Sequence, residues 1–278
     1  MKGVMTILSI PRSAYLVGYQ NKDATEKATI WVNMFPNTSG KEMTLGDIMA
    51  NSFDDTDGDA YGTLEWTGFV PFSDFIQTMN TVGKFTGKYT YVPDGYKVGV
   101  AQGWYDFKDK TCKTEANSVE IPFTHGFYLA SGDGNGGLAP MLSFCGNVKP
   151  DPTIVSVASS SMLTGNCTPV DITLGQITAN SFDDTDGETY GTLEWTGFVP
   201  FSDFIQVMND KGKFIGKYTY APAGYKNGNV AGWYEFTDKE CTDCVNDSVV
   251  IKAGQAVYVS ANDGNGGLAP TITIPSAL

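Results

Sequence analysis

The chain contains one segment of about 129 residues written twice, and this duplication limits what it can fold into. Residues 51–58 recur as residues 180–187, and residues 61–77 recur without a change as residues 190–206. A segment of this length can bury a core of its own, unlike a short solenoid repeat. The duplication therefore predicts two similar globular units joined head to tail.

The likeness fades toward the ends of each copy, and the fading predicts the domain boundaries. A short linker with two prolines lies at residues 149–152, between the copies. We expect a first module at residues 28–148 and a second at residues 149–278. Ala28 to Val32 is the best match to Thr153 to Val157. Residues 1–27 have no match in the second copy, which predicts an added N-terminal strand or arm.

The local sequence pattern is that of β-strands in both copies. Phe85 to Val92 is a run of residues that favour strands, and Phe127 to Leu129 is a shorter apolar run between turn residues. Residues 209–213 include a Gly between two such runs, which predicts a β-hairpin. Helical periodicity is weak throughout. The sequence predicts an all-β protein of two tandem β-sandwich or jelly-roll-like domains.

Composition excludes two classes of partner. The net charge is −13 with a pI near 4.4, and an acidic surface repels phosphate backbones, so we expect no nucleic-acid partner. A membrane-spanning helix needs about 18 or more consecutive apolar residues. No run in the sequence approaches that length, so we expect no membrane span.

Two equivalent acidic loops are the densest polar clusters in the sequence. Carboxylates spaced by one or two residues around a Gly can wrap a hard cation such as Ca²⁺. The spacing departs from that of an EF-hand loop, and the alternative is an acidic turn without an ion, since Asp and Gly favour turns. The candidate calcium ligands are Asp54, Asp55, Asp57, Asp59, Asp183, Asp184, Asp186 and Glu188.

Aromatic residues make up 13% of the chain, and they recur at matching positions. Exposed Trp and Tyr rings beside acidic residues can stack on sugar rings, whereas buried rings belong to the core. Both alternatives are open for most of these rings. A Trp-Tyr pair follows a Gly near a turn in each copy, and we take these pairs as the first choice for exposed, ligand-binding rings. They are Trp104, Tyr105, Trp233 and Tyr234.

The sequence gives little support for catalysis. His125 is the only histidine, and Gln255 takes its place in the second copy. The five cysteines include one Cys-x-x-Cys pair, Cys241 and Cys244, for which a local disulfide or two buried thiols is favoured over a metal site. No nucleophile, phosphate-loop or dinucleotide motif is found. We therefore expect a protein that is not an enzyme.

The order of four short motifs carries a resemblance. An Ile-Gln strand at Ile76, an aromatic strand at residues 89–91, a Gly-Trp turn at Gly103 and a Gly-aromatic strand at Gly126 follow one another in the first module. This order resembles an uncharacterised tandem β repeat of bacterial surface or secreted proteins. The resemblance implies extracellular or cell-surface display and names no activity.

Two functional hypotheses follow from the sequence. The first is a structural protein that assembles with copies of itself into a filament, surface layer or coat. The near identity of the modules supports it, and so does an N-terminal segment, Val4 to Ile10, that could add a strand to a neighbour's sheet. The second is a carbohydrate-binding module that uses exposed aromatic rings and Ca²⁺.

Overall fold

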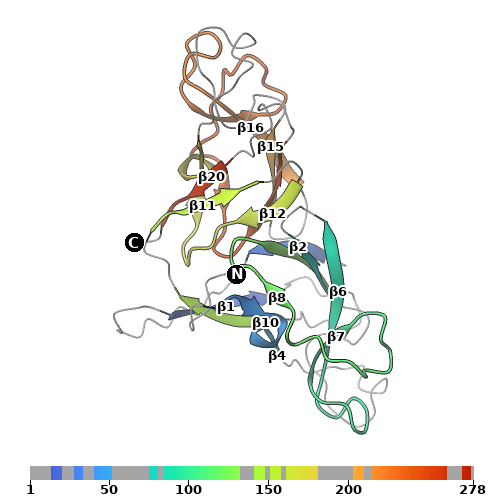
Figure 1. The fold of residues 1–278 in the computed structure, drawn as a ribbon. Coiled ribbons are helices and arrows are strands. Elements are labelled where there is room, and N and C mark those ends of the chain that lie inside the picture. The colour runs from blue at the N-terminus through green and yellow to red at the C-terminus, as the bar shows by residue number, and fades with distance from the viewer. Residues whose placement is uncertain are drawn as a thin grey trace.

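The computed structural model describes residues 14–20, 28–33, 41–51, 75–80, 84–131, 141–147, 151–157, 161–180, 203–209, 214–261 and 271–276. Within these ranges the fold consists of antiparallel strands and two short 3₁₀ helices (Figure 1), so the expectation of an all-β protein is confirmed. No helix in this part of the chain is long and apolar enough to cross a membrane. We call residues 14–148 repeat 1 and residues 149–278 repeat 2.

Strands from residues 14–147 form three sheets. The three-stranded sheet has the order β1 (Ala14–Gln20), β10 (Met141–Asn147), β4 (Met49–Asn51). The five-stranded sheet has the order β2 (Ala28–Asn33), β9 (Gly126–Ser131), β5 (Phe75–Met79), β6 (Phe85–Val92), β7 (Gly103–Asp106). A two-stranded ladder joins β3 (Met43–Thr44) to β8 (Glu120–Ile121), and the 3₁₀ helix η1 (Leu45–Asp47) follows β3.

Repeat 2 forms three sheets of the same sizes. The three-stranded sheet has the order β11 (Thr153–Ser156), β20 (Thr271–Ile274), β14 (Thr178–Asn180). The five-stranded sheet has the order β12 (Ser161–Gly165), β19 (Ala256–Ser260), β15 (Phe204–Met208), β16 (Phe214–Ala221), β17 (Gly232–Glu235). The two-stranded ladder joins β13 (Ile172–Thr173) to β18 (Val250–Ile251), and η3 (Leu174–Gln176) follows β13.

Sheet order corrects one sequence correspondence. β11 holds the place in its sheet that β1 holds beside β10, and β12 holds the place of β2. The match of Ala28 to Val32 with Thr153 to Val157 is therefore wrong, because those segments lie in different sheets. Part of residues 1–27, which we predicted as an added N-terminal strand or arm without a match in the second copy, is β1, and it pairs along its whole length with β10. Pairing geometry, and not residue identity, defines this equivalence.

The predicted hairpin of repeat 2 is confirmed. β15 pairs with β16 across residues 209–213, and the register shifts between Val207 and Met208. The equivalent hairpin, β5 with β6, has its shift at the equivalent place, between Thr78 and Met79. An extra residue at this point bends the strand and increases its twist, so both five-stranded sheets take the same local shape.

The buried side chains of the two repeats form one continuous hydrophobic cluster. β12 shows why: Met162 and Leu163, whose side chains point to opposite faces of the strand, are 2% and 0% exposed. β12 and β19 lie against β2 and β9 of repeat 1, which cover the face that would otherwise meet solvent. The repeats thus bury apolar surface against each other through equivalent strands.

Candidate binding surface

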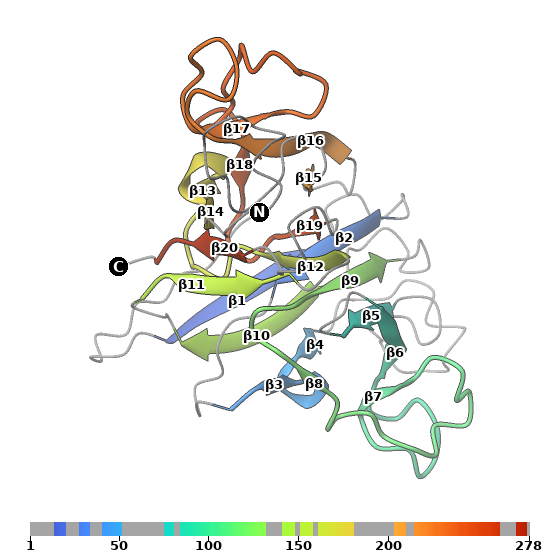
Figure 2. The same cartoon turned by 45° about the horizontal axis from the view of Figure 1, so that its top comes forward.

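Two equivalent loop clusters stand at the ends of the molecule farthest from the contact between the repeats. Tip 1 comprises residues 93–102 and 107–119, which flank β7, and tip 2 comprises residues 222–231 and 236–249, which flank β17. Figures 1 and 2 show them at opposite ends, tip 1 in green and tip 2 in orange. The tips are therefore positioned to meet other molecules.

A single aspartate organises the longer loop of each tip. The Asp109 carboxylate accepts hydrogen bonds from the backbone N–H groups of Thr111, Lys113 and Thr114, at 3.2, 2.8 and 3.1 Å. The Thr111 hydroxyl also donates to it, and because these donors favour the ionised carboxylate, the pKa of Asp109 falls to about 2. The bonds to the Asp109 carboxylate fix the backbone conformation of this loop, so the loop presents a defined surface.

Asp238 plays the same part in tip 2. Its carboxylate accepts from the N–H groups of Thr242 and Asp243, at 2.8 and 3.0 Å. The N–H bond from Asp243 is the main reason that the pKa of Asp238 lies below its usual range. The two tips therefore share one loop design.

A buried tyrosine and a buried thiol fill the base of each tip. Tyr105 and Cys112 pack together in tip 1, as Tyr234 and Cys241 do in tip 2. The tyrosine hydroxyls donate to Ala101 O at 2.9 Å and to a carbonyl at the equivalent position of tip 2 at 2.8 Å. Burial raises the pKa of both tyrosines and of both thiols. These groups are neutral packing elements at physiological pH.

Cysteines at the tips hold an unusual backbone conformation. Cys112 and Cys241 have φ of 52° and 53°, in the left-handed region where non-glycine residues are uncommon. Cys112, Cys241 and Cys244 are free thiols, so the alternative of two thiols in the Cys-x-x-Cys pair fits, although Cys244 is exposed and not buried. Cys241, not the pair, is the feature that both tips share.

The Trp-Tyr pairs lie in the core. Trp104 and Trp233 are 0% exposed, and Tyr105 and Tyr234 are also buried, so the expectation that these rings are exposed is wrong. The indole N–H groups donate to the carbonyls of Ile48 at 2.8 Å and of its counterpart in repeat 2 at 2.7 Å. The Gly-Trp turn that we expected is the first residue pair of β7 and of β17, whose first three residues are all buried.

An asparagine fixes each of these tryptophans from the tip side. The Asn117 side-chain oxygen accepts the N–H of Trp104 at 2.9 Å, and Asn246 does the same for Trp233. A Cβ at Gly103 would lie 2.7 Å from the Asn117 amide, so glycine is required there for this contact. The bond joins each tip to the core of its repeat.

Aromatic-lysine clusters, which sequence reasoning missed, join each tip to the neighbouring strands. Lys88 Nζ lies 3.6 Å from the ring centroid of Phe75 and 4.1 Å from that of Phe107, and Lys110 Nζ lies 4.4 Å from Phe107. These distances are typical of cation–π contacts. The equivalent cluster in repeat 2 is Phe204, Lys217, Phe236 and Lys239. The identical Phe and Lys positions of the two repeats are the sequence pattern that could have revealed them.

A shallow cleft of about 290 Å³ lies beside tip 1. Met49, Tyr91 and Gln102 line it together with residues of the Trp104 environment. Trp104 offers no ring face to a ligand there, because it is fully buried. In repeat 2 the positions of Met49 and Gln102 hold Thr178 and Ala231, so the cleft lining differs between repeats.

The acidic loops, with all eight candidate calcium ligands, lie outside the described residues. The described residues themselves hold no group of three or more metal-ligating side chains. Calcium binding by these loops stays a prediction. If folded sites bind Ca²⁺, the melting temperature will be higher with Ca²⁺ than with a chelator, because a ligand of the folded state stabilises it by mass action. An unchanged melting temperature would favour the ion-free acidic turn.

His125 is buried with one ring nitrogen unsatisfied. His125 is only 6% exposed. Its Nδ1 atom is 3.1 Å from the Thr124 hydroxyl, and its Nε2 atom has no hydrogen-bond partner. Gln255, its counterpart, accepts from the Lys252 N–H at 2.9 Å and donates to the carbonyl of Met208. Glutamine therefore satisfies both of its polar atoms at a place where histidine satisfies one.

Burial lowers the pKa of His125 below its ordinary value of 6.5. The unfolded chain then binds more protons than the folded chain in acid, so the stability is complete above pH 6.5 and falls as the pH decreases below it. The slope is at most about 1.4 kcal/mol per pH unit. His125→Gln is expected to remove this component in denaturant titrations from pH 7 to pH 5. An unchanged slope would show that other groups cause it.

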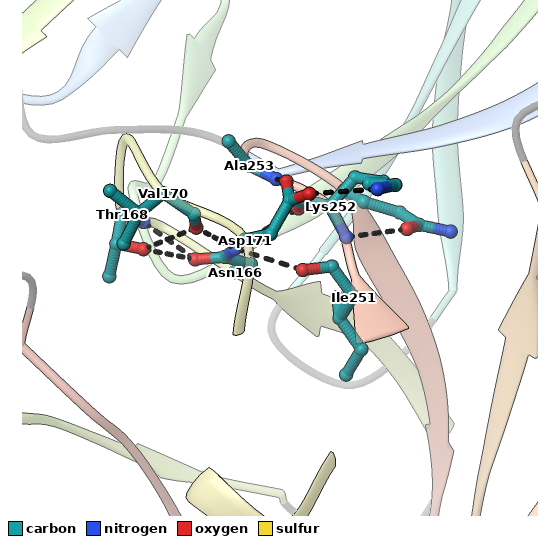
Figure 3. A network of polar contacts seen from close by, with 8 residues as sticks. Asn166, Thr168, Val170, Asp171, Ile251, Lys252 and Ala253 are labelled. Carbon is teal, nitrogen blue, oxygen red and sulfur yellow. Dashed lines mark hydrogen bonds and ion pairs between the residues drawn. The ribbon is translucent and has the colours of Figure 1, made fainter. Parts of the chain in front are cut away.

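A polar network holds the end of β12 in repeat 2 (Figure 3). The Asn166 side-chain nitrogen donates to the carbonyls of Val170, Ile251 and Lys252, at 2.7, 3.2 and 3.1 Å. Its oxygen accepts from the N–H and the hydroxyl of Thr168, at 2.9 and 2.6 Å. Asn166 is fully buried. Its side chain therefore supplies the hydrogen bonds that these backbone carbonyls would otherwise need from water.

An exposed ion pair continues this network. Lys252 Nζ lies 2.8 Å from the Asp171 carboxylate, which also accepts the N–H of Ala253 at 2.9 Å. In repeat 1, Glu42 accepts the N–H of Phe123 at 2.9 Å, which is the same contact at the equivalent positions. A carboxylate therefore secures this turn in both repeats, and the turn has a structural role.

Comparisons with known proteins add no relative. No protein-family model matches the chain, and no curated protein matches it. The two tips, the aromatic-lysine clusters and the cleft are therefore the basis for a functional proposal.

Proposed function

We propose that this protein is a non-enzymatic structural protein that assembles with copies of itself into an extracellular filament, surface layer or coat. The observation that supports this most directly is the presence of two equivalent tips at opposite ends of the molecule. A subunit with a contact surface at each end can bind a neighbour on both sides. Contacts of that kind form an open polymer when they do not close into a ring.

The roles of the polar side chains agree with a structural protein. Asp109, Asn117 and Asn166 each form hydrogen bonds with backbone groups of their own repeat and with nearby side chains of it. A catalytic acid or base must instead reach a reacting atom of a substrate. The proposal therefore assigns no catalytic residue.

The proposal includes an arrangement for the two repeats. We take each repeat as a β-sandwich-like module in which a three-stranded and a five-stranded sheet enclose core side chains, because the sheet order is the same in both. Strand addition by residues 4–10, which lie outside the described residues, is a second proposed route of assembly. β1 is already paired with β10, so this route would use the segment before β1.

Electron microscopy of the negatively stained full chain, with sedimentation of the same samples, tests the proposal. Ordered polymers are expected, and the pelleted fraction should rise with protein concentration. Salt and Ca²⁺ are varied in separate series, so that an effect of the acidic loops can be distinguished from an effect of the tips. Dispersed monomers under all these conditions would contradict a self-assembling function.

Carbohydrate binding is the second candidate function, and the cleft beside tip 1 favours it. Its volume of about 290 Å³ is at the lower limit for small-ligand pockets and suits one sugar ring. Gln102 provides an exposed neutral amide, a group that forms hydrogen bonds with sugars, beside the buried ring of Tyr91. This site would belong to repeat 1 alone, since Ala231 replaces Gln102 in repeat 2.

A glycan array with the full chain and a Gln102→Ala variant tests this alternative. A specific sugar ligand is expected to lose binding by about tenfold, since the loss of one good hydrogen bond to a ligand costs about 1–1.5 kcal/mol. Gln77→Ala, at a half-buried position of β5 outside the cleft, is the control. Absence of glycan binding, or equal binding by wild type and Gln102→Ala, would count against carbohydrate recognition in the cleft.

A further inference from the structure

The tips share a backbone design but differ in charge. Tip 1 contains four lysines and three carboxylates, whereas tip 2 contains two lysines and four carboxylates. The lysines that only tip 1 has are Lys108 and Lys113, whose counterparts are Thr237 and Thr242. The net charge is thus slightly positive at one end of the molecule and negative at the other.

The negative charge of tip 2 comes from positions that are neutral or missing in tip 1. Glu240 and Asp243 stand where tip 1 has Thr111 and Thr114, and Asp247 is an inserted residue. All three acidic side chains are exposed, as are Lys108 and Lys113. Glu240 forms an ion pair with Lys226 at 3.1 Å, so Asp243 and Asp247 are the better probes of the surface charge.

The charged groups that act on the two equivalent buried thiols, Cys112 and Cys241, differ in the same way. Burial is the main reason that the pKa of Cys112 lies above its ordinary value, and beyond burial Asp109 raises this pKa while Lys97 and Lys110 lower it. Burial is also the main reason for the raised pKa of Cys241, and beyond burial Asp238 and Glu240 raise this pKa while Lys226 lowers it. The balance of nearby charges therefore changes from tip 1 to tip 2 at positions that otherwise match.

We propose that the partner of tip 1 is tip 2 of another copy of this chain, so that the molecules associate head to tail. The proposal rests on the self-assembly proposed above and names its contact surfaces. Opposite charges at the two tips favour this contact, while a contact between two tips of the same kind would place like charges together. A second copy is the occupant that the charges fit, because each chain carries both signs on tips that lie at opposite ends.

The packing between the repeats leaves the two tips as the surfaces for contact between chains. β2 and β9 lie against β12 and β19 within one chain, so these equivalent strands already satisfy each other. The tips stay at the ends, where each can contact a neighbour (Figure 2). A head-to-tail contact between unlike tips generates a polar filament, in which every subunit points the same way.

Charge reversal of each tip in the full chain tests this proposal. Lys108→Glu/Lys113→Glu makes both tips negative, and Asp243→Lys/Asp247→Lys makes both tips positive. Because like charges then meet in every head-to-tail contact, each variant alone should need about tenfold more protein to assemble. A one-to-one mixture of the two variants should assemble as readily as wild type, because the unlike molecules alternate.

Salt dependence and folding are the controls. Raising the ionic strength should weaken assembly of the wild type, because salt screens the attraction between unlike tips. It should strengthen assembly of each double-substitution variant on its own, because salt also screens the repulsion between like tips. All four side chains are exposed, so circular dichroism and the melting temperature should stay unchanged. The four-fold variant, which exchanges the signs of both tips, should assemble like wild type.

The outcomes separate this proposal from the function on which it rests. A wild type that never assembles would overturn both. A wild type that assembles while both charge variants assemble equally well would overturn the tip-to-tip contact and leave self-assembly in place. Failure of the mixture to assemble, when each variant is folded, would also overturn it.

Discussion

Replacing Trp233 with alanine is expected to lower the free energy of unfolding by about 3–5 kcal/mol, as for other fully buried tryptophans. The indole is 0% exposed, it packs at 5.3 Å from the ring of Tyr220, and its N–H donates to the carbonyl of Ile177 at 2.7 Å. Alanine removes the ring, leaves a cavity and leaves that carbonyl without its donor. Denaturant titration followed by far-ultraviolet circular dichroism measures the loss.

Matched variants make this prediction specific. Trp104→Ala should cost a similar amount, because Trp104 has the equivalent bond to Ile48 and packs at 5.3 Å from Tyr91. Phe214→Ala should cost about 1 kcal/mol or less, since Phe214 is 56% exposed and loses little buried area. A loss at Trp233 no larger than that at Phe214 would contradict the buried position of the indole.

Replacing Asn166 with alanine is expected to lower the free energy of unfolding by about 3 kcal/mol. The change removes one donor group that serves three carbonyls and one acceptor that serves Thr168. Each buried polar group left unsatisfied costs about 1–3 kcal/mol, although the loop can relax around some of them. Thermal and denaturant unfolding of the full chain both measure this effect.

Asp171→Asn is the control for Asn166. It removes the ion pair with Lys252, whose side chains are each 46% exposed, and keeps a side chain that can still accept the Ala253 N–H. An exposed pair of this kind contributes about 0–1 kcal/mol. If Asp171→Asn costs as much as Asn166→Ala, the stability of this turn depends on charge and not on the buried amide.

The burial of the tryptophans also changes how a binding test must be designed. Trp104→Ala or Trp233→Ala would lower stability, so a loss of glycan binding in those variants would not identify a binding residue. Gln102 is exposed at the cleft and can be changed with little effect on the fold. Binding tests therefore need surface positions such as this one.

Sequence reasoning found the strands more easily than the exposure of their side chains. The hairpin of β15 and β16 follows from a Gly-containing loop between two runs of strand-forming residues, which is local information. The face of a strand that is buried depends on what packs against it. Gly, Trp and Tyr in succession resemble a turn, yet Gly103, Trp104 and Tyr105 are all buried in β7.

The candidate surface was predictable only in part. Lys88, Phe75 and Phe107 are separated in sequence and meet because β5, β6 and β7 are neighbours in one sheet. The charge difference between the tips can be seen in the sequence, but its meaning depends on the tips lying at opposite ends. Distance along the chain does not give that arrangement.

The amino-acid sequence by itself determined the duplication, the all-β class and the matching aspartate and cysteine positions of the two tips. These properties depend on residue identity and on local backbone preferences, which repeat wherever the sequence repeats. Tertiary structure alone decided that β1 corresponds to β11, that the tryptophans are internal and that the repeats share one hydrophobic cluster. Those features depend on which strands pair and which faces exclude water, and both are set by contacts between segments far apart in the chain.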